Sequence, residues 1–163
     1  MCERRKRVGI AITLREFLES HDTDYEVIDH QRTHSTLWTS EAAHIPGDKM
    51  AKSVLLGDDE SYLMVVIPAS HRLELRELSA MTGRDLELID EQELTEAFAD
   101  CEPGAVPPVG KPYGIETLVD KCLVDQADVF FETGDHTKVI HVSGTQFRSL
   151  MDDAQPARLS NHL

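Results

Sequence analysis

Three features of the sequence could carry chemistry: a lysine in an apolar run, a loop rich in glycine and proline, and a tight Gly-Asp-His turn. Lys52 interrupts the apolar run 50–56, where it places a cation among side chains expected to be buried. The loop 101–110, CEPGAVPPVG, fits neither a helix nor the interior of a strand, so it exposes main-chain N–H and C=O groups. A rigid connector and a lysine that reaches the surface are the simpler interpretations.

The histidines are the first alternative, because the chain has eight of them and imidazole is a common metal ligand. Three residues separate His30 from His34, and four separate His136 from His141. Neither pair has a carboxylate or cysteine partner at a recognised ligand spacing, so we predict no metal and no other cofactor. A metal-dependent hydrolase that uses His30, His34 or His136 is the remaining alternative of this class.

Nucleophilic catalysis has weaker support. The sequence has no Gly-x-Ser-x-Gly elbow, and neither Cys101 nor Cys122 lies in a context that would lower a thiol pKa. We expect Cys122 to be an inert thiol within a strand. Glycine-rich nucleotide-binding loops are also missing from the sequence, so it implies no nucleotide cofactor.

The composition is that of a soluble globular protein, with 40% hydrophobic and 28% charged residues. A formal charge of −14 argues against DNA and broad nucleic-acid binding, although a small cationic site could still form. No apolar run approaches the roughly 20 residues that cross a membrane, and the basic start of the chain has no apolar stretch behind it. We therefore expect a cytoplasmic protein without membrane contact.

Hydrophobic periodicity and turn residues predict interleaved helices and strands. Thr13 and Glu16 have capping-box spacing for a first helix, and Thr39 or Ser40 could cap a second. The run 62–67 lacks polar alternation, so it should be a central strand that is covered on both faces. The predicted helices are 12–20, a short one from 39 or 40 to 45, 75–82, one from Asp90, and one from Ser143; the predicted strands are 25–30, 50–56, 62–67, 86–89, 117–124, 128–131 and 138–142.

Gly83 should end the helix 75–82, and the turn residues 57–61 predict a hairpin of 50–56 with 62–67. Several of the predicted strands are joined too tightly for βαβ crossovers. The predicted fold is therefore mixed α/β (α+β), with a mixed, largely antiparallel central sheet and helices around it. We expect a single domain over residues 1–163, with residues 1–8 and 153–163 flexible.

The segment 102–110 resembles the Gly-x-x-x-Pro loop of the YbaK-like, prolyl-tRNA synthetase-associated editing domains, which are aminoacyl-tRNA deacylases. The resemblance extends over most of the chain in matching order. It includes a helix start at 39–43, a lysine-bearing strand at 51–56, a strand at 118–123 and the glycine turn 134–136.

This resemblance implies a free-standing hydrolase that cleaves the ester of mischarged tRNA at the acceptor end, in trans. Such an ester is already activated, so a positioned water and oriented dipoles can supply much of the acceleration. Lys52 would contact the terminal phosphate or the region of the substrate carbonyl. The resemblance assigns catalysis to Lys52, Gly104 and Pro108, and substrate binding to His34, Thr36, Thr39, Ala105, Val106, Gly110, Gly134, Asp135 and His136.

The strong negative charge is a departure that keeps a second function open. A noncatalytic module of the same fold could bind an amino acid, an aminoacyl adenylate or the end of a tRNA without turnover. The amino acid, the tRNA and the oligomeric state lie beyond what the sequence predicts.

Overall fold

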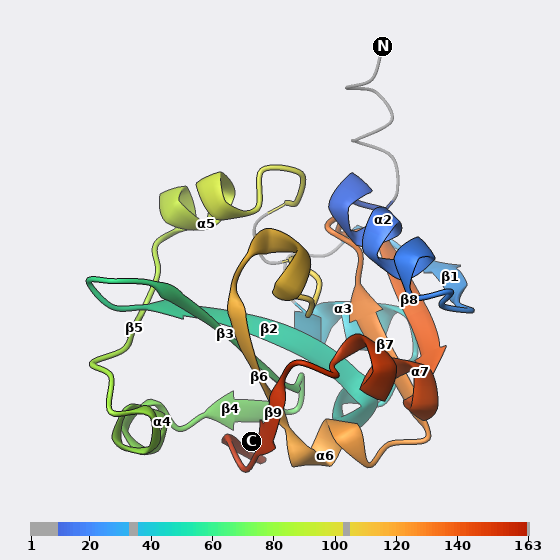
Figure 1. Ribbon diagram of the computed structural model, residues 1–163. Coiled ribbons are helices and arrows are strands. Elements are labelled where there is room, and N and C mark those ends of the chain that lie inside the picture. Colours follow the sequence, from blue (N-terminus) through green and yellow to red (C-terminus); the bar gives the residue numbers. More distant parts are fainter. Residues whose placement is uncertain (1–9, 33–35, 103–104, 163) are drawn as a thin grey trace.

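The strands of the computed structural model, which describes residues 10–32, 36–102 and 105–162, form one large sheet and one small one (Figure 1). The large sheet has the order β1-β8-β7-β2-β3-β6-β9, with β5 paired to β2, and the small sheet pairs β10 with β4. The strands are β1 (Glu26–Asp29), β2 (Met50–Gly57), β3 (Tyr62–Pro68), β4 (His71–Leu73), β5 (Glu87–Leu88), β6 (Glu116–Asp120), β7 (Asp128–Glu132), β8 (Lys138–Ser143), β9 (Gln155–Ala157) and β10 (Ser160–His162).

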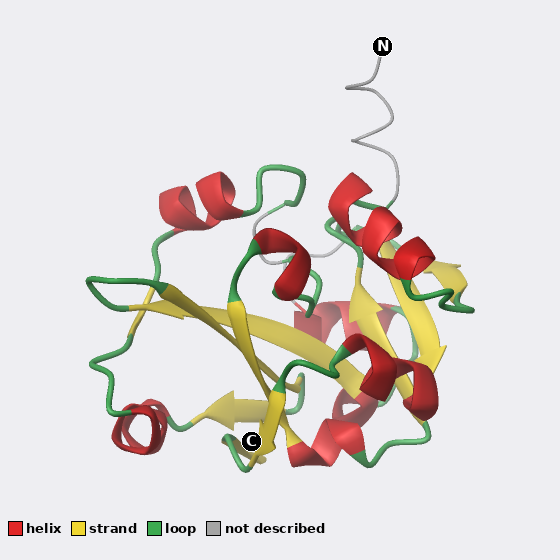
Figure 2. Cartoon of the chain, in the orientation of Figure 1, coloured by secondary structure: helices red, strands yellow, loops and turns green. Residues whose placement is uncertain are grey.

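Helices cover both faces of the large sheet (Figure 2). In Figure 1, α3 lies behind β7, whereas α7 lies in front of it. The helices are α2 (Ile12–Ser20), α3 (Thr36–Ala42), α4 (Leu75–Thr82), α5 (Glu91–Ala97), α6 (Lys121–Val124) and α7 (Gly144–Leu150), with 3-10 turns η1 (Gly47–Lys49) and η2 (Lys111–Tyr113). No helix among these described residues is long and apolar enough to span a bilayer.

The antiparallel hairpin of β2 and β3 forms the centre of the sheet and confirms the predicted pairing of 50–56 with 62–67. β3 continues in parallel to β6, and β2 continues in parallel to β7. Six of the seven residues of β3 are buried, because helices pack on both faces. The predicted mixed α/β fold with a mixed central sheet is therefore confirmed.

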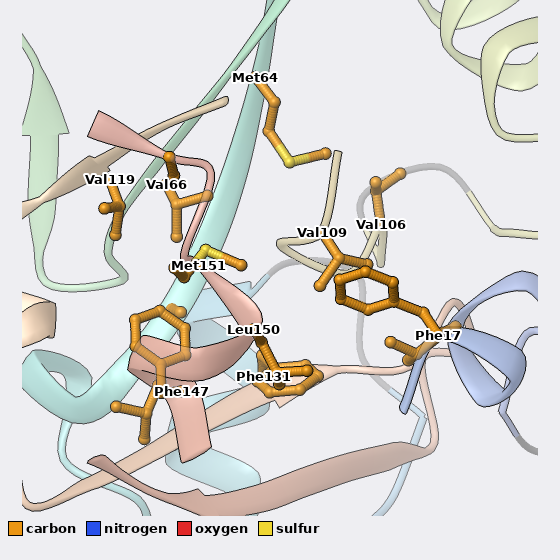
Figure 3. Close-up of a cluster of buried hydrophobic side chains, with 14 of the residues drawn as sticks. Phe17, Met64, Val66, Val106, Val109, Val119, Phe131, Phe147, Leu150 and Met151 are labelled. Carbon is orange, nitrogen blue, oxygen red and sulfur yellow. The ribbon is translucent and has the colours of Figure 1, made fainter. Parts of the chain in front are cut away.

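Alternate residues of β2 face two separate cores, since successive side chains of a strand point to opposite faces. Ala51 and Leu55 join the main core with Phe131, whereas Leu56 joins a second core under α4. Figure 3 shows the main core, in which Val106 from the loop lies in the same cluster as aromatic side chains of β7 and α7. Part of the loop is thus anchored by apolar packing.

Three local predictions succeed because short-range chemistry decides them. Ser143 and Gln146 form the capping box of α7, and Asp90 accepts a hydrogen bond from Glu93 N at the start of α5. Gly83 ends α4 in a left-handed conformation.

The predicted caps of the first two helices are wrong. Ala11 is the N-cap of α2 without a side-chain bond, and the N–H of Thr13 donates to Asp100 Oδ2 at 3.0 Å. A distant carboxylate therefore replaces the local cap. Thr39 lies inside α3, which begins at Thr36 and ends at Ala42.

The sequence also misplaces two segments near the C-terminus. β6 ends at Asp120, and Cys122 is an exposed residue of α6, because the Asp120 side chain caps that helix by accepting from Cys122 N. We expected the chain after residue 152 to be frayed, but β9 pairs with β6 and β10 pairs with β4. The expected flexibility of residues 1–8 lies outside the described residues.

Candidate functional site

The loop and the glycine turn are joined directly by main-chain hydrogen bonds. Glu102 N donates to Gly134 O at 2.7 Å, and Gly134 N donates to Ala105 O at 2.8 Å. The Glu102 side chain adds a third bond by accepting from His136 N at 2.9 Å. Two segments about 30 residues apart in the sequence therefore form one rigid unit.

This unit fills the place where β2 and β7 separate. The parallel pairing of the two strands ends at Ala51 and Phe131. Two residues further along β2, the hydroxyl of Ser53 donates to Val106 O at 2.7 Å. The loop backbone at 105–106 therefore bridges from the turn after β7 to β2.

Two glycines are required by this geometry. Gly134 has a φ of +96°, and a Cβ on it would lie 2.9 Å from Ala11 Cβ and 3.1 Å from Cys101 Sγ. At Gly110 a Cβ would lie 2.2 Å from Thr117 Oγ1 and 2.6 Å from Ile115 O. Larger residues at these positions would push the loop away from the strands.

Lys52 lies next to this unit but its side chain leaves β2 on the opposite face from Ser53. The Nζ atom donates to the carbonyl oxygen of His71 at 3.0 Å. Burial of this half-buried amine lowers the pKa of Lys52 below its ordinary value. The strand therefore presents a partly desolvated cation on one face and the loop contact on the other.

Glu132, the last residue of β7, lies on the same face of the sheet as Lys52. Met50 pairs with Phe130 in the parallel register, and alternate residues share a face, so Glu132 follows Phe130 as Lys52 follows Met50. The Glu132 side chain is 2% exposed, and its Oε2 lies 3.7 Å from His136 Nδ1. The site thus contains a buried carboxyl group that the sequence reading did not select.

Burial raises the pKa of Glu132 to about 7. The hydroxyls of Thr36 and Thr39 lie close enough to lower it in part, and the charges of Glu102 and Asp135 raise it again. A carboxyl group with such a pKa can hold or accept a proton near neutral pH.

Comparison with known proteins identifies the family. The sequence profile of the aminoacyl-tRNA editing domain matches residues 30–150, a range that contains Lys52, the loop and Glu132. The chain belongs to the aminoacyl-tRNA editing domain family. The predicted membership in a family of tRNA-editing domains is therefore confirmed. No curated protein matches the chain.

Solved structures share the fold of this editing domain. A candidate trans-editing enzyme for prolyl tRNA synthetase superposes with a TM-score of 0.79 at 20% identity, covering 93% of this chain and 96% of that one. A hypothetical protein has a TM-score of 0.80 at 20% identity, covering 91% and 99%. A candidate signal transduction protein from Marinobacter aquaeolei has a TM-score of 0.74 at 20% identity; 93% of this chain matches 31% of that longer one.

Within the editing domain, several residues that the sequence singled out gather around Glu132. Thr36 and Thr39 are one turn apart on α3, and Thr39 is fully buried. His136 approaches Glu132 from the glycine turn. Asp135 shapes that turn, since its Oδ1 accepts from Thr137 N at 2.7 Å.

The described loop residues, in contrast to those around Glu132, are held by main-chain hydrogen bonds and buried side chains. Pro108 is buried, and the carbonyl of Gly110 accepts hydrogen bonds from Tyr113 N and Ile115 N. Ala105 and Val106 contribute their carbonyls to the bridge and bury their side chains. His34 and Gly104, two further predicted site residues, lie outside the described residues, and the role of every residue in this set stays a prediction.

The two cysteines within the described residues, Cys101 and Cys122, are not activated. Burial raises the pKa of the Cys101 thiol to about 12, with the nearby Asp100 carboxylate adding to the shift. Cys122 is exposed, and its pKa is also raised, by desolvation first and by Asp120 next. Both shifts disfavour the thiolate.

One feature of the sequence could have pointed to Glu132. It is the only acidic residue between Asp128 and Asp135, in the stretch DVFFETGD, and it follows three apolar residues at the end of a predicted strand. An acid directly after a buried run indicates either a strand that has reached solvent or a buried carboxyl group. Only the tertiary position of α3 decides between these two interpretations.

Proposed function

We propose that this chain is an aminoacyl-tRNA deacylase, which hydrolyses the ester between a wrongly attached amino acid and the 3′ end of tRNA. The observation that carries the proposal is the loop backbone held between Ser53 and Gly134, with the buried Glu132 close to the same turn. Membership in the editing domain family supports the substrate class.

The reaction needs a positioned water and a place for one proton. Water adds to the ester carbonyl carbon, the bond to the ribose oxygen breaks, and the products are the free amino acid and a tRNA with its hydroxyl restored. In our proposal Glu132 accepts the proton of the attacking water and returns one to the leaving ribose oxygen. A group with a pKa near the working pH is suited to both transfers.

The loop backbone supplies orientation in this proposal. The segment from Gly104 to Pro108 and the residue Gly110 hold the terminal adenosine and face the developing negative charge with main-chain dipoles. Because the bridge is made through the carbonyls of Ala105 and Val106, backbone shape matters more there than side-chain identity.

In this proposal Lys52 supplies a local cation on β2, in a chain whose net charge is −14. Its amine is half-buried, where a charge interacts more strongly with an anionic phosphate or a polarised carbonyl than it would in water. The side chains that line the amino-acid pocket in this proposal are His34, Thr36, Thr39, Asp135 and His136.

The test is hydrolysis of a panel of mischarged tRNAs by the wild-type protein and the Lys52→Ala variant. We expect at least one ester to be cleaved faster than without protein, and the variant to lose about 100-fold of that rate. Lys121→Ala, which removes an exposed lysine of α6, is the matched control and should keep full activity. Rates equal to the no-protein rate for every ester would refute the proposal, and repeating the assay with a chelator tests the metal-dependent alternative.

A noncatalytic binding module is the second candidate function. It is favoured by the match to 31% of a longer chain described as a candidate signal transduction protein, which shows that this fold also occurs inside larger proteins. Binding of an amino acid or of an acceptor-stem RNA without any turnover would select this alternative.

A further inference from the structure

Away from the loop, a chain of buried polar side chains connects the C-terminal strand β10 to Lys52. Asp120 Oδ2 accepts from the hydroxyl of Ser160 at 2.7 Å, and Ser160 Oγ lies 2.9 Å from His71 Nδ1. The carbonyl of the same His71 accepts from Lys52 Nζ at 3.0 Å. A continuous path therefore runs from a carboxylate on β6 to the amine on β2.

The hydrogens in this path have defined positions. A hydroxyl has one proton, and Ser160 donates it to Asp120, so Ser160 can only accept from His71. His71 must then carry a hydrogen on Nδ1. The orientation of the His71 ring is thus fixed from the β10 side.

All three side chains of the path are buried: Asp120 is 1% exposed, Ser160 7% and His71 9%. Burial raises the pKa of Asp120, but hydrogen bonds from Cys122 N, Ser160 and Leu159 N outweigh it and lower that pKa. A buried, ionised carboxylate is costly unless several donors satisfy it. The network is therefore rigid, and it supports His71, the residue to which Lys52 donates its hydrogen bond.

The backbone around His71 is held on one edge by the same strand. β4 pairs antiparallel with β10, with His71 opposite His162 and Leu73 opposite Ser160. The side-chain path and this small sheet therefore both hold His71, whose carbonyl accepts the hydrogen bond from Lys52.

We propose that Asp120, Ser160 and His71 are positioning residues, which hold the His71 carbonyl where it fixes the Lys52 amine for its role in the site. The functional part of this proposal rests on the proposed deacylase activity. The positioning itself is a property of the free protein and can be measured without any substrate.

The experiment is a pH titration of the Lys52 side chain, followed by side-chain carbon NMR, in wild type and in Ser160→Ala. Burial lowers the pKa of Lys52, so release of the amine from its site beside the His71 carbonyl to solvent should raise that pKa toward the ordinary lysine value. Ser160→Thr keeps the hydroxyl and should restore the wild-type titration. Asn161→Ala is the matched control, because it removes a β10 side chain that bonds to Glu74 at 2.8 Å and lies outside the path.

His71→Phe serves as a second variant should Ser160→Ala fail to fold, since it keeps a ring and the carbonyl but loses the ring nitrogen. An unchanged Lys52 titration in a folded Ser160→Ala or His71→Phe variant would overturn the proposal. An equal shift in Asn161→Ala would also overturn it, because the effect would then belong to the strand as a whole.

Deacylation provides the functional readout. If Lys52 acts as proposed, Ser160→Ala should lower the rate of ester hydrolysis by about 10-fold to 100-fold, and Ser160→Thr should recover it. A shifted titration with an unchanged rate would uphold the positioning and count against a role of Lys52 in the reaction, so the two proposals fail separately.

Discussion

The two sides of β2 hold their parts of the site by different means. On the Ser53 side, main-chain hydrogen bonds and apolar packing of Val106 fix the loop. On the Lys52 side, the groups are ionisable and shielded from solvent: the half-buried lysine, the buried Glu132 and the buried path through His71. Packing and main-chain geometry therefore hold the Ser53 side in place, whereas the charge and protonation of side chains hold the Lys52 side.

This difference predicts how each side responds to change. Packing and main-chain geometry do not titrate, so damage to the loop should lower stability equally at every pH. Buried ionisable groups couple stability to proton binding, so changes on the other side should depend on pH. Variants on each side of β2 should therefore differ in how their stability depends on pH.

The largest effect on stability is expected for Gly110→Ala. The new Cβ would overlap the backbone carbonyl of Ile115, so the loop or β6 must move, at a cost of about 3 kcal/mol. Urea denaturation at pH 5 and pH 8 should show the same loss. Gly83→Ala, where a Cβ meets nothing within 4 Å but φ is +69°, should cost only about 1 kcal/mol.

Glu132→Gln should change the pH dependence of stability. The ordinary pKa of this carboxyl group is 4.5, and burial raises it to about 7 in the folded state. The folded protein therefore binds more protons than the unfolded chain between these values, and wild type loses stability as the pH rises through them. The variant lacks this loss, so its stability relative to wild type should be greater at pH 8 than at pH 4.

Thermal unfolding across that pH range measures the effect. Glu16→Gln, an exposed change on α2, should follow the wild-type curve. A Glu132→Gln curve parallel to wild type would show that the carboxyl group does not titrate in this window, and the distinction between the two sides of β2 would lose its main support.

Val106→Ala should have a smaller effect that separates stability from activity. Removing two buried methyl groups should cost about 2 kcal/mol, while the carbonyl that accepts from Ser53 stays in place. We therefore expect weaker resistance to urea with ester hydrolysis within about threefold of wild type. A loss of activity as large as that of Lys52→Ala would mean that the side chain, rather than the backbone, carries the function of the loop.

Arg32→Ala should have the smallest effect. Arg32 bonds Glu102 at 2.6 Å, but its side chain is 56% exposed, and such ion pairs contribute little. We expect no measurable change in Tm. A clear drop would show that the loop depends on its exposed end as well as on the bridge between Ser53 and Gly134.

Much of the fold could be predicted from the sequence because local chemistry determines it. The hairpin of β2 and β3, the Ser143 cap and the Gly83 stop each depend on residues close together in the chain. The cap of α2 by Asp100 and the pairing of β9 with β6 could not be predicted, because they join segments far apart in the sequence.

The sequence predicted the main segments of the site but missed part of its ionisable groups. The loop and the glycine turn were selected for their backbone properties, and the structure joins them through Gly134. Glu132 was missed because its burial depends on α3, and the route from Lys52 to Ser160 was missed because the tail was expected to fray. Buried polar groups are determined by tertiary contacts, which no local pattern reveals.

Single-turnover hydrolysis of a mischarged tRNA at pH 7 should be compared between wild type, Lys52→Met and Glu132→Gln. If the charged side of β2 performs the reaction, both variants should remain folded and lose about 100-fold in rate. If either folded variant cleaves the ester as fast as wild type, that residue has no part in the chemistry and the account of this site is wrong.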